Sequence, residues 1–260
     1  MPEFRKIISK DNSLIKLTSL IQKSSKARKE EGLFVLEGFR ICMDAAENGV
    51  SFDTLILSES VYEKMSDDIL FLSKNSENGA VVSDELFKKI SDTASPQGII
   101  AVCPIPEIST KLNACGRYVA LENISDPANL GAIARTAESL GINGLIITGD
   151  SCDIYSPKSL RASMGTLLRM PVFLCDDILS FIKENSLRGF ACVAQDRADI
   201  LFGEFKFSNG DVVIIGNEAN GLKQSTKENA YKTITIPMCG NVESLNAASA
   251  ASIAMWELMK

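Results

Sequence analysis

The most informative stretch of this chain is IPMCGNVESLN, residues 236–246. A run of β-branched residues at 233–236 predicts a short buried strand. Pro237 and Gly240 then end the strand, because proline cannot donate to a ladder and glycine lets another group approach the backbone closely. An Ala- and Ser-rich segment follows at once and predicts a helix over residues 246–259.

A polar cluster separates this strand from this helix and consists of Asn241, Glu243, Ser244 and Asn246. Either Ser244 or Asn246 can cap the helix. A helix of small side chains buries little area per residue, so it is most useful where another backbone comes very close. Two interpretations remain open from the motif alone, an ordinary capped helix or a crowded junction or subunit contact beside a polar loop.

The composition bounds the class of protein. The chain has 260 residues, enough for one large domain or two small ones, and its 27 basic and 33 acidic residues give a net charge of −6. This acidic balance argues against a protein that binds nucleic acid over its whole surface, but not against a local basic patch. The first thirty residues carry a net +5, which leaves −11 for the remainder. That asymmetry indicates either a basic contact surface or a solvated amphipathic helix.

The cysteine and histidine contents narrow the possible chemistry. The seven cysteines are scattered without a CxxC pair, which is typical of reduced cysteines in a cytoplasmic protein and not of a disulfide framework or a zinc site. There is no histidine, so Ser-His-Asp, Cys-His and His-metal sites are excluded. No secretory leader or membrane-spanning run is apparent. We therefore expect a cytoplasmic protein without a metal site.

The first hundred residues predict a small α/β unit. A basic helix is expected over residues 4–30, and Ile8 lies on its apolar face. The strands expected after it are 34–36, 54–57, 80–82 and 98–102, and the helices are 38–48 and 83–90. Residues 103–116 contain two prolines and no clear periodicity, so the linker between domains is expected there.

Strands and helices alternate regularly from residue 117 onward. The expected strands are 118–122, 144–148, 172–174, 189–194, 211–215 and 233–236, and the expected helices are 129–140, 157–168, 177–185, 221–228 and 246–259. Uniformly apolar strands in such an alternation predict a mostly parallel sheet covered on both faces. Ligands of such sheets bind beyond the carboxyl ends of the strands. Candidate site loops should therefore follow strands.

The first such loop follows the strand that ends at residue 122. Asp126 can cap the next helix and Pro127 suits its first turn. Asn129 is then expected in the exposed first turn, and Arg135 lies two turns further on, near apolar positions. An arginine in that setting is either one partner of a buried ion pair or a binder of anions.

The second loop follows the strand at 211–215. Gly216 and Gly221 bracket the carboxylate of Glu218 on a strand-to-helix turn. Gly216 would let a ligand approach the backbone, and Glu218 could accept a hydrogen bond from a hydroxyl or an arginine. In isolation, an ordinary strand-to-helix turn is the better explanation of this pattern. The pattern is not GxGxxG, which disfavours a nucleotide-dependent oxidoreductase.

A further candidate lies on the helix expected at 157–168. Lys158, Arg161 and Ser163 recur at helical spacing and could form an edge that faces phosphate groups. A charged, solvated helix surface is the alternative.

The loops around 129, 218 and 244, taken together and in this order, resemble the three motifs of the SpoU (TrmH-type) RNA 2′-O-ribose methyltransferases of the SPOUT class. The resemblance covers residues 117–258. The matching residues are Asn129 and Arg135 in the first motif, Gly216, Glu218 and Gly221 in the second, and Ser244 and Asn246 in the third. Residues 30–102 resemble, more loosely, the L30e-like substrate-binding domain that often precedes this domain.

The resemblance implies a domain organisation, a fold and partners. Residues 1–102 would form the basic helix and the L30e-like RNA substrate-binding domain, 103–116 the linker and 117–260 the methyltransferase domain. The catalytic domain would be a parallel α/β sheet with a trefoil knot, one of the rare exceptions to the rule against knots. The resemblance also implies an obligate homodimer and S-adenosylmethionine as the cofactor.

The resemblance also implies roles for individual residues. Gly216, Ile236, Met238, Gly240 and Leu245 match the region that binds the cofactor, mostly through the backbone. Arg135 would grip the target phosphate and orient the 2′-hydroxyl, with Asn129, Glu218, Ser244 and Asn246 completing the catalytic set. RNA contacts would come from Lys158, Arg161 and Ser163. Ribosomal RNA is favoured over transfer RNA as the substrate, and a non-catalytic RNA-binding protein is the alternative from another class.

Overall fold

The computed structural model describes residues 2–106, 112–194, 198–240, 242 and 244–260. The chain divides into two compact units. The first comprises Met1–Pro106 and Asp153–Arg169, and the second comprises Glu107–Cys152 and Met170–Lys260. The segment Asp153–Arg169 thus packs with the first unit, although the sequence placed it in the second domain. Strand β5 (Ile99–Pro104) extends into the expected linker, and residues 107–111 of that linker lie outside the described part.

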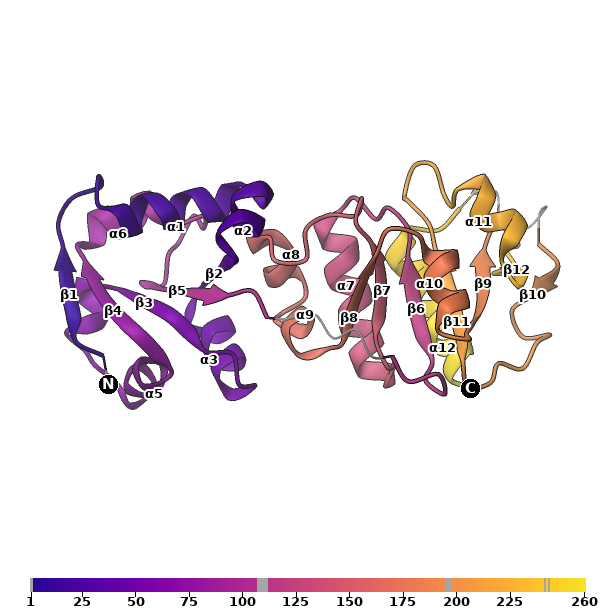
Figure 1. Cartoon of the computed structure of the whole chain (residues 1–260), viewed down its shortest axis with the longest axis horizontal. Coiled ribbons are helices and arrows are strands. Elements are labelled where there is room, and N and C mark those ends of the chain that lie inside the picture. The colour runs from indigo at the N-terminus through magenta and orange to yellow at the C-terminus, as the bar shows by residue number, and fades with distance from the viewer. Residues whose placement is uncertain (1, 107–111, 195–197, 241, 243) are drawn as a thin grey trace. The chain divides into compact units, whose positions relative to one another are not determined.

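The first unit is built on a five-stranded mixed sheet in the order β1-β4-β3-β5-β2 (Figure 1). Its other strands are β1 (Phe4–Ile7), β2 (Leu33–Glu37), β3 (Phe52–Ser58) and β4 (Ser76–Val82). Strands β1 and β3 pair parallel with β4, and β5 pairs antiparallel with β3 and β2. The small α/β unit expected from the sequence is therefore present, with one additional strand at its edge.

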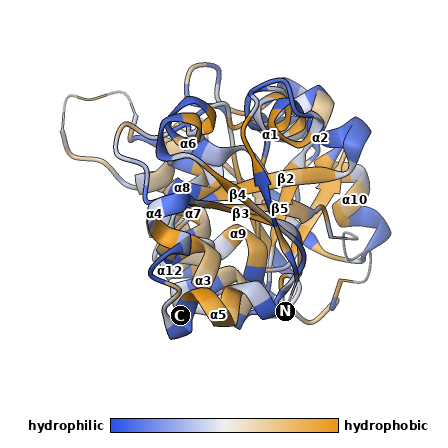
Figure 2. Cartoon of the chain, turned by 90° about the vertical axis from the view of Figure 1, so that its left-hand side faces the viewer, coloured by the Kyte–Doolittle hydropathy of each residue, from blue (hydrophilic) through white to orange (hydrophobic). Residues whose placement is uncertain are grey.

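Helices cover both faces of this sheet (Figures 1 and 2). On one face lie α1 (Ser13–Lys23), α2 (Ser25–Glu31) and α6 (Asp84–Ile90), whose apolar side chains pack on those of β2 to β5. On the other lie α3 (Phe39–Glu47) and α5 (Asp67–Lys74). The short helices α4 (Glu59–Tyr62) and α5 were not expected from the sequence.

The helix expected over residues 4–30 is wrong in two places. Its first residues form β1, where the ring of Phe4 lies over Gly79 of β4 and 5.2 Å from the ring of Tyr62. Ile8, expected on the apolar face, is 86% exposed. The remainder divides at Ser24, whose extended backbone ends α1 and whose hydroxyl caps α2. The partners of Phe4 lie more than fifty residues away, so local periodicity does not reveal them.

The second unit is built on a seven-stranded sheet in the order β10-β12-β9-β11-β6-β7-β8. Every adjacent pair in it is parallel. The strands are β6 (Tyr118–Leu121), β7 (Leu145–Thr148), β8 (Val172–Cys175), β9 (Arg188–Cys192), β10 (Ile200–Leu201), β11 (Asp211–Ile215) and β12 (Lys232–Thr235). The residues of the central strands β6, β7 and β11 are all buried. This confirms the predicted parallel sheet.

Both faces of the second sheet are covered, as uniformly apolar strands require. Helix α12 (Ala247–Met259) packs on α7 (Pro127–Leu140) and on β11, on one face. Helix α10 (Ile178–Glu184) packs on the other, beside α11 (Gln224–Asn229), and its Ile178 and Ile182 belong to the core there. None of the helices in the described ranges is long and apolar enough to cross a membrane.

The helix expected over residues 157–168 is also interrupted. It forms α8 (Pro157–Ala162) and α9 (Thr166–Arg169), both in the first unit. The break falls at Met164 and Gly165, which have φ angles of 50° and 82°. The left-handed conformation of two successive residues cannot be part of a right-handed helix.

Candidate active site

The candidate active site lies at the carboxyl ends of neighbouring strands of the second unit. In the sheet, β11 lies beside β6 and β6 lies beside β7. The loops that follow β6 and β11 therefore leave the sheet at the same edge and next to each other. These are the two loops that the sequence singled out after strands, and the segment before α12 joins them there.

The loop after β6 leads into a well-capped helix. The side chain of Asp126 accepts a hydrogen bond from the backbone N–H of Ala128 at 2.9 Å, and Pro127 occupies the first turn of α7. Both features were predicted. Asn129, however, was expected to be exposed and is only 7% exposed. Asn129 is buried by tertiary contacts, because side chains from two other loops lie against it.

The loop after β11 is closed by its own backbone. Asn217 and Gly221 exchange two N–H to C=O hydrogen bonds of 3.1 and 2.9 Å, and Gly221 has a φ of 65°. A Cβ at Gly216 would come within 2.4 Å of the backbone of Gly221 and Leu222. The sequence attributed the glycine at 216 to the approach of a ligand, but here its own loop makes the close approach. The two glycines thus form a tight loop that presents Glu218.

The carboxylate of Glu218 joins the two loops. Its Oε2 accepts from the Ser125 hydroxyl at 2.9 Å and from the Ser125 N–H at 3.2 Å. Its Oε1 accepts from the side-chain amide of Asn129 at 2.8 Å and from the N–H of Asp126 at 3.2 Å. The sequence predicted a hydroxyl or an arginine as the donor to Glu218, and in the structure the donors include the Ser125 hydroxyl and the Asn129 amide but not Arg135.

The third motif connects to the same group through Asn246. Its Nδ2 donates to Oδ1 of Asn129 at 3.0 Å, while its Oδ1 caps α12 by accepting from the N–H groups of Ala248 and Ser249. Asn246 is therefore the helix cap, of the two candidates. A continuous chain of hydrogen bonds runs from Asn246 through Asn129 to Glu218. It links residues from all three motifs, and each of its two bonds joins residues more than eighty positions apart in sequence.

The pKa of Glu218 reflects this environment. Burial raises it, but hydrogen bonds from the Asn129 amide, from the Glu218 N–H and from Ser125 outweigh that effect and lower the pKa to about 2. Hydrogen bonds to the charged form of a carboxyl group favour ionisation. Glu218 is thus an anion at neutral pH, and a carboxylate with so low a pKa is a weak base.

Arg135 and Ser244 lie outside this hydrogen-bonded chain. Both are exposed, and within the described part of the chain neither side chain forms a hydrogen bond or an ion pair. This excludes a buried ion pair for Arg135 within the described chain and leaves its guanidinium available to an anion. The neighbouring positions Asn241 and Glu243 lie outside the described residues.

Sequence reasoning missed several residues that shape this site. Ser125 contributes two of the hydrogen bonds to Glu218. Asn217 donates from its side chain to the carbonyl of Asn123 at 2.8 Å and so ties the second loop to the first. Asn123 has a φ of 57°, and Thr148 at the end of β7 bonds both its N–H and its side chain. An asparagine directly after a strand was the available signal, because asparagine tolerates left-handed backbone.

The residues proposed to hold the cofactor fall on the segment after β12 and on the loop after β11. Ile236, Met238 and Leu245 are half-buried. Gly240 is exposed, and a Cβ there would meet nothing within 4 Å. The backbone groups of Ile236 and Gly240 make no hydrogen bond to any described residue. Half-buried apolar side chains beside uncommitted backbone groups suit a flat adenine ring with a polar edge, so these residues fit S-adenosylmethionine.

The three residues proposed to contact RNA lie in the first unit, on the segment Asp153–Arg169. Lys158 is exposed on α8. Arg161 forms an ion pair of 2.8 Å with Asp92. Ser163 is fully buried, and its hydroxyl donates to the carbonyl of Leu160. Of the three, Lys158 is thus the side chain that presents its charge to solvent without a partner among the described residues.

Two family models match the chain. The model of the SpoU rRNA Methylase family matches residues 116–256, which contain all three loops of the candidate active site. The model of the MRM3-like substrate binding domain matches residues 12–101, which fall within the first unit. Both matches agree with the resemblance found in the sequence, which was to a methyltransferase domain preceded by a substrate-binding domain.

Individual proteins resemble the chain over nearly its whole length. An uncharacterized tRNA/rRNA methyltransferase of Synechocystis sp., slr1673, is 30% identical, covering 96% of this chain and 92% of that protein. The 23S rRNA (uridine(2479)-2′-O)-methyltransferase of Streptomyces viridochromogenes is 28% identical, covering 100% and 93%. The crystal structure of the SpoU methyltransferase AviRb from the same organism, in complex with AdoMet, has a TM-score of 0.82 at 24% identity, covering 95% of this chain and 98% of that one.

Proposed function

We propose that ribosomal RNA is the substrate of this chain, which belongs to the SpoU rRNA methylase family. The chain is an RNA 2′-O-ribose methyltransferase that uses S-adenosylmethionine. The observation that carries the proposal is the hydrogen-bonded chain Asn246–Asn129–Glu218, which joins the three motifs at the carboxyl edge of the parallel sheet. A protein that only bound RNA would have no need to join these three loops.

We infer that the reaction is a direct displacement. The cofactor supplies a methyl group on a sulfonium, and its thioether leaves without needing a proton. The protein must therefore align the ribose oxygen and help to remove its proton, and no general acid is required. With a pKa near 2, Glu218 is better suited to holding Asn129 in place than to accepting that proton.

Arg135 is assigned to the target phosphate. It is exposed on α7 without a partner in the described chain, and a guanidinium presents two parallel donors to a phosphate. An arginine keeps its charge at any ordinary pH, so it orients the 2′-hydroxyl and does not act as the base. Asn129, Ser244 and Asn246 would hold the nucleotide from the opposite loops. Lys158, exposed on α8, would contribute a phosphate contact from the first unit.

We infer a homodimer formed through α12. Its Ala251, Ala254 and Met255 are buried, but Ile253 and Trp256 on its outer face are 38% and 56% exposed. Ile253 and Trp256 are three positions apart and so lie on the same face of the helix, and adjoining exposed apolar side chains are typical of a protein–protein contact. The small residues of this helix would let a second copy approach closely.

The threading of residues 236–246 as a trefoil knot stays part of the proposal. Its support is that the segment leaves β12 near one edge of the sheet, whereas α12 packs against α7 and β11 near the middle. A location in the cytoplasm is proposed on the cysteines, since all seven lie in the described part of the chain and no disulfide joins any of them.

The proposal is tested by transfer of labelled methyl from S-adenosylmethionine to unmodified total RNA, followed by digestion to nucleosides. The expected product is a 2′-O-methyl nucleoside in the ribosomal RNA fraction. A base-methylated nucleoside would overturn the ribose assignment, and label confined to transfer RNA would overturn the substrate class. If the protein does not bind S-adenosylmethionine in a direct binding measurement, the assignment as a methyltransferase is wrong.

A further inference from the structure

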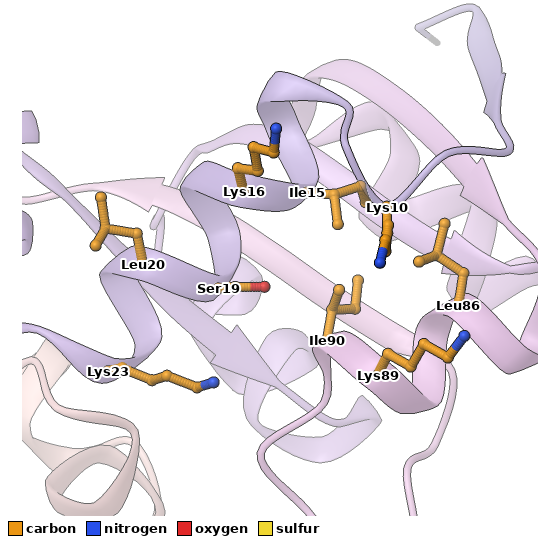
Figure 3. Close-up of a pocket in the computed structure, with 9 residues that line it drawn as sticks. All are labelled: Lys10, Ile15, Lys16, Ser19, Leu20, Lys23, Leu86, Lys89 and Ile90. Atoms are coloured by element: carbon orange, nitrogen blue, oxygen red, sulfur yellow. The ribbon is translucent and has the colours of Figure 1, made fainter.

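An open groove of about 450 Å³ lies on the first unit, far in sequence from the catalytic motifs (Figure 3). Helices α1 and α6 form its walls, on the same face of the five-stranded sheet. None of the residues assigned above to catalysis, cofactor binding or RNA contact lines it. Its volume lies within the range of roughly 300–1,000 Å³ that is common for ligand sites.

The floor of this groove is apolar. Ile15, Leu86 and Ile90 reach it from the core and are at most 6% exposed as whole residues. Leu20, on α1, also lines the groove and is 51% exposed. The floor is therefore continuous with the hydrophobic core beneath it and has one leucine that stands free in solvent.

The rim of the groove is basic. It carries Lys10, Lys16, Lys23 and Lys89, and no acidic side chain lines it. Lys16 forms an ion pair of 3.2 Å with Asp11, but both side chains are more than 60% exposed, so that pair holds Lys16 weakly. The ammonium groups of the other three lysines have no ionic or hydrogen-bonding partner in the described part of the chain. Figure 3 shows Lys10, Lys23 and Lys89 around the space between the two helices.

We propose that this groove binds a sugar–phosphate segment of the RNA substrate and positions it without reading its sequence. The inference rests on the proposed function, because it names the surface by which the same substrate is held. A concentration of lysines on a chain with a net charge of −6 indicates a polyanionic partner. The ammonium groups would neutralise phosphates, and the apolar floor would accept the faces of riboses or bases.

The chemistry of the lining also argues for positioning over sequence recognition. Bases are usually distinguished by arginine, asparagine or glutamine, and single strands are usually stacked on aromatic rings. The groove has none of these residues, and its only other polar side chain is Ser19. Lysine is a flexible point charge, which suits phosphates at varied positions. An acidic peptide would satisfy the same charges, but RNA is favoured because the substrate-binding-domain model matches residues 12–101.

The test removes two lysines from the groove and two from outside it. Lys23→Gln/Lys89→Gln neutralises one residue on each wall. Lys29→Gln/Lys88→Gln is the matched control, because these lysines are exposed on α2 and α6 but do not line the groove. Binding of an unmodified ribosomal RNA transcript is measured by filter retention without cofactor, between 50 and 200 mM salt, with the RNA dissociation constant as the readout.

We expect the groove variant to bind the RNA about tenfold more weakly at low salt, and the slope of log affinity against log salt to become shallower by about 1.5. The loss should be equal for transcripts of unrelated sequence. In the methylation assay KM for RNA should rise, while kcat at saturating RNA stays unchanged, since no groove residue belongs to the catalytic set.

Equal affinities for the groove and control variants would overturn the proposal, as would binding of an acidic peptide to the groove that does not displace the RNA. A loss that depends on sequence would overturn the positioning role. These outcomes are separate from failure of the methyltransferase assignment, because binding is measured without cofactor. If the wild-type chain binds RNA through the groove but transfers no methyl group, the proposed role of the groove holds and the methyltransferase assignment fails.

Discussion

The carboxylate of Glu218 accepts hydrogen bonds from four other residues, Ser125, Asp126, Asn129 and Asn217, so its position determines how the surrounding groups are oriented. An amide group in Asn129 is held at both ends, donating to Glu218 and accepting from Asn246. The orientation of that amide is therefore determined by its partners. A substrate that approached Asn129 would meet a pre-oriented group and would not need to organise it.

Replacing Glu218 with glutamine should change the acid stability of the protein. The folded-state pKa is about 2 and the ordinary value is 4.5, so the carboxylate stabilises the folded state above about pH 4.5 and loses that contribution as the pH falls towards 2. The difference in unfolding free energy between the wild type and Glu218→Gln should thus be constant above pH 5 and shrink below it. Urea unfolding at several pH values measures this. Glu204→Gln, an exposed glutamate in the same unit, is the control. A difference that persists unchanged to pH 2 would contradict the assignment.

Two substitutions of Arg135 distinguish the contribution of its positive charge from that of its two parallel hydrogen-bond donors. Arg135→Ala should lower methyl transfer by about 100-fold or more, because a donor aimed at developing or bound charge is lost. Arg135→Lys keeps the charge but not the two parallel donors, so its rate should fall between those of alanine and wild type. Cofactor affinity, measured by calorimetry, should be unchanged in both. Normal turnover by Arg135→Ala, or the same loss in Lys206→Ala on the exposed surface, would refute the role.

At the scale of the element, the two glycines near the cofactor residues should behave differently. A Cβ at Gly216 would collide with the Gly221–Leu222 backbone, so Gly216→Ala should destabilise the protein by about 1–3 kcal/mol, the usual cost of overpacking. A Cβ at Gly240 meets nothing within 4 Å, so Gly240→Ala should leave the melting temperature unchanged. If Gly240 lies against the cofactor, Gly240→Ala should instead weaken cofactor binding. Thermal melting and calorimetry on both variants distinguish the two effects.

Helix α12 supports a second prediction at this scale. Trp256→Glu places a charge on the outer face of the helix and should convert the proposed dimer into monomers, with loss of methyl transfer if the site needs both copies. Sedimentation equilibrium measures the assembly state. Leu174→Glu is the control, because Leu174 is an exposed apolar residue of β8 at the edge of the same sheet. A Trp256→Glu variant that remains dimeric would place the interface elsewhere.

The sequence predicted elements well where local pattern determines them. Buried strands such as β11 and the capped start of α7 follow from apolar runs and from Asp126 and Pro127. It failed for β1, whose partner Gly79 is remote, and for the break between α8 and α9, which depends on left-handed backbone at Met164. The motif residues were identified by resemblance. The contacts of Ser125 could not be predicted, because they arise only when two separate loops meet.

At the scale of the whole molecule, the chain passes between its two units three times, because Asp153–Arg169 belongs to the first unit while the residues on either side belong to the second. That segment is held by buried contacts. Arg28, which is 4% exposed, donates to Asp153 at 2.7 and 2.8 Å, and the ring of Tyr155 lies 5.1 Å from that of Phe34. The linker near residue 106 is therefore not the only covalent link between the units.

A fragment of residues 107–260 should consequently not retain all of its structure. Without the first unit, Asp153 and Tyr155 lose their partners, so amide hydrogens in 153–169 should exchange fast in the fragment and slowly in the full chain. Hydrogen exchange read by mass spectrometry measures this, with the amides of β6 and β11 as the internal control. Equal protection of 153–169 in both proteins would show that the segment is stable without the first unit.

The excursion of Asp153–Arg169 also limits how such proteins can be recombined. A chimera that takes its N-terminal half from a relative and joins it near residue 106 would pair foreign residues at 34 and 28 with the native Tyr155 and Asp153. Exchange of the substrate-binding module would have to carry the segment 153–169 along with residues 1–106. Specificity in this architecture is therefore inherited in two separate stretches of gene, which must change together.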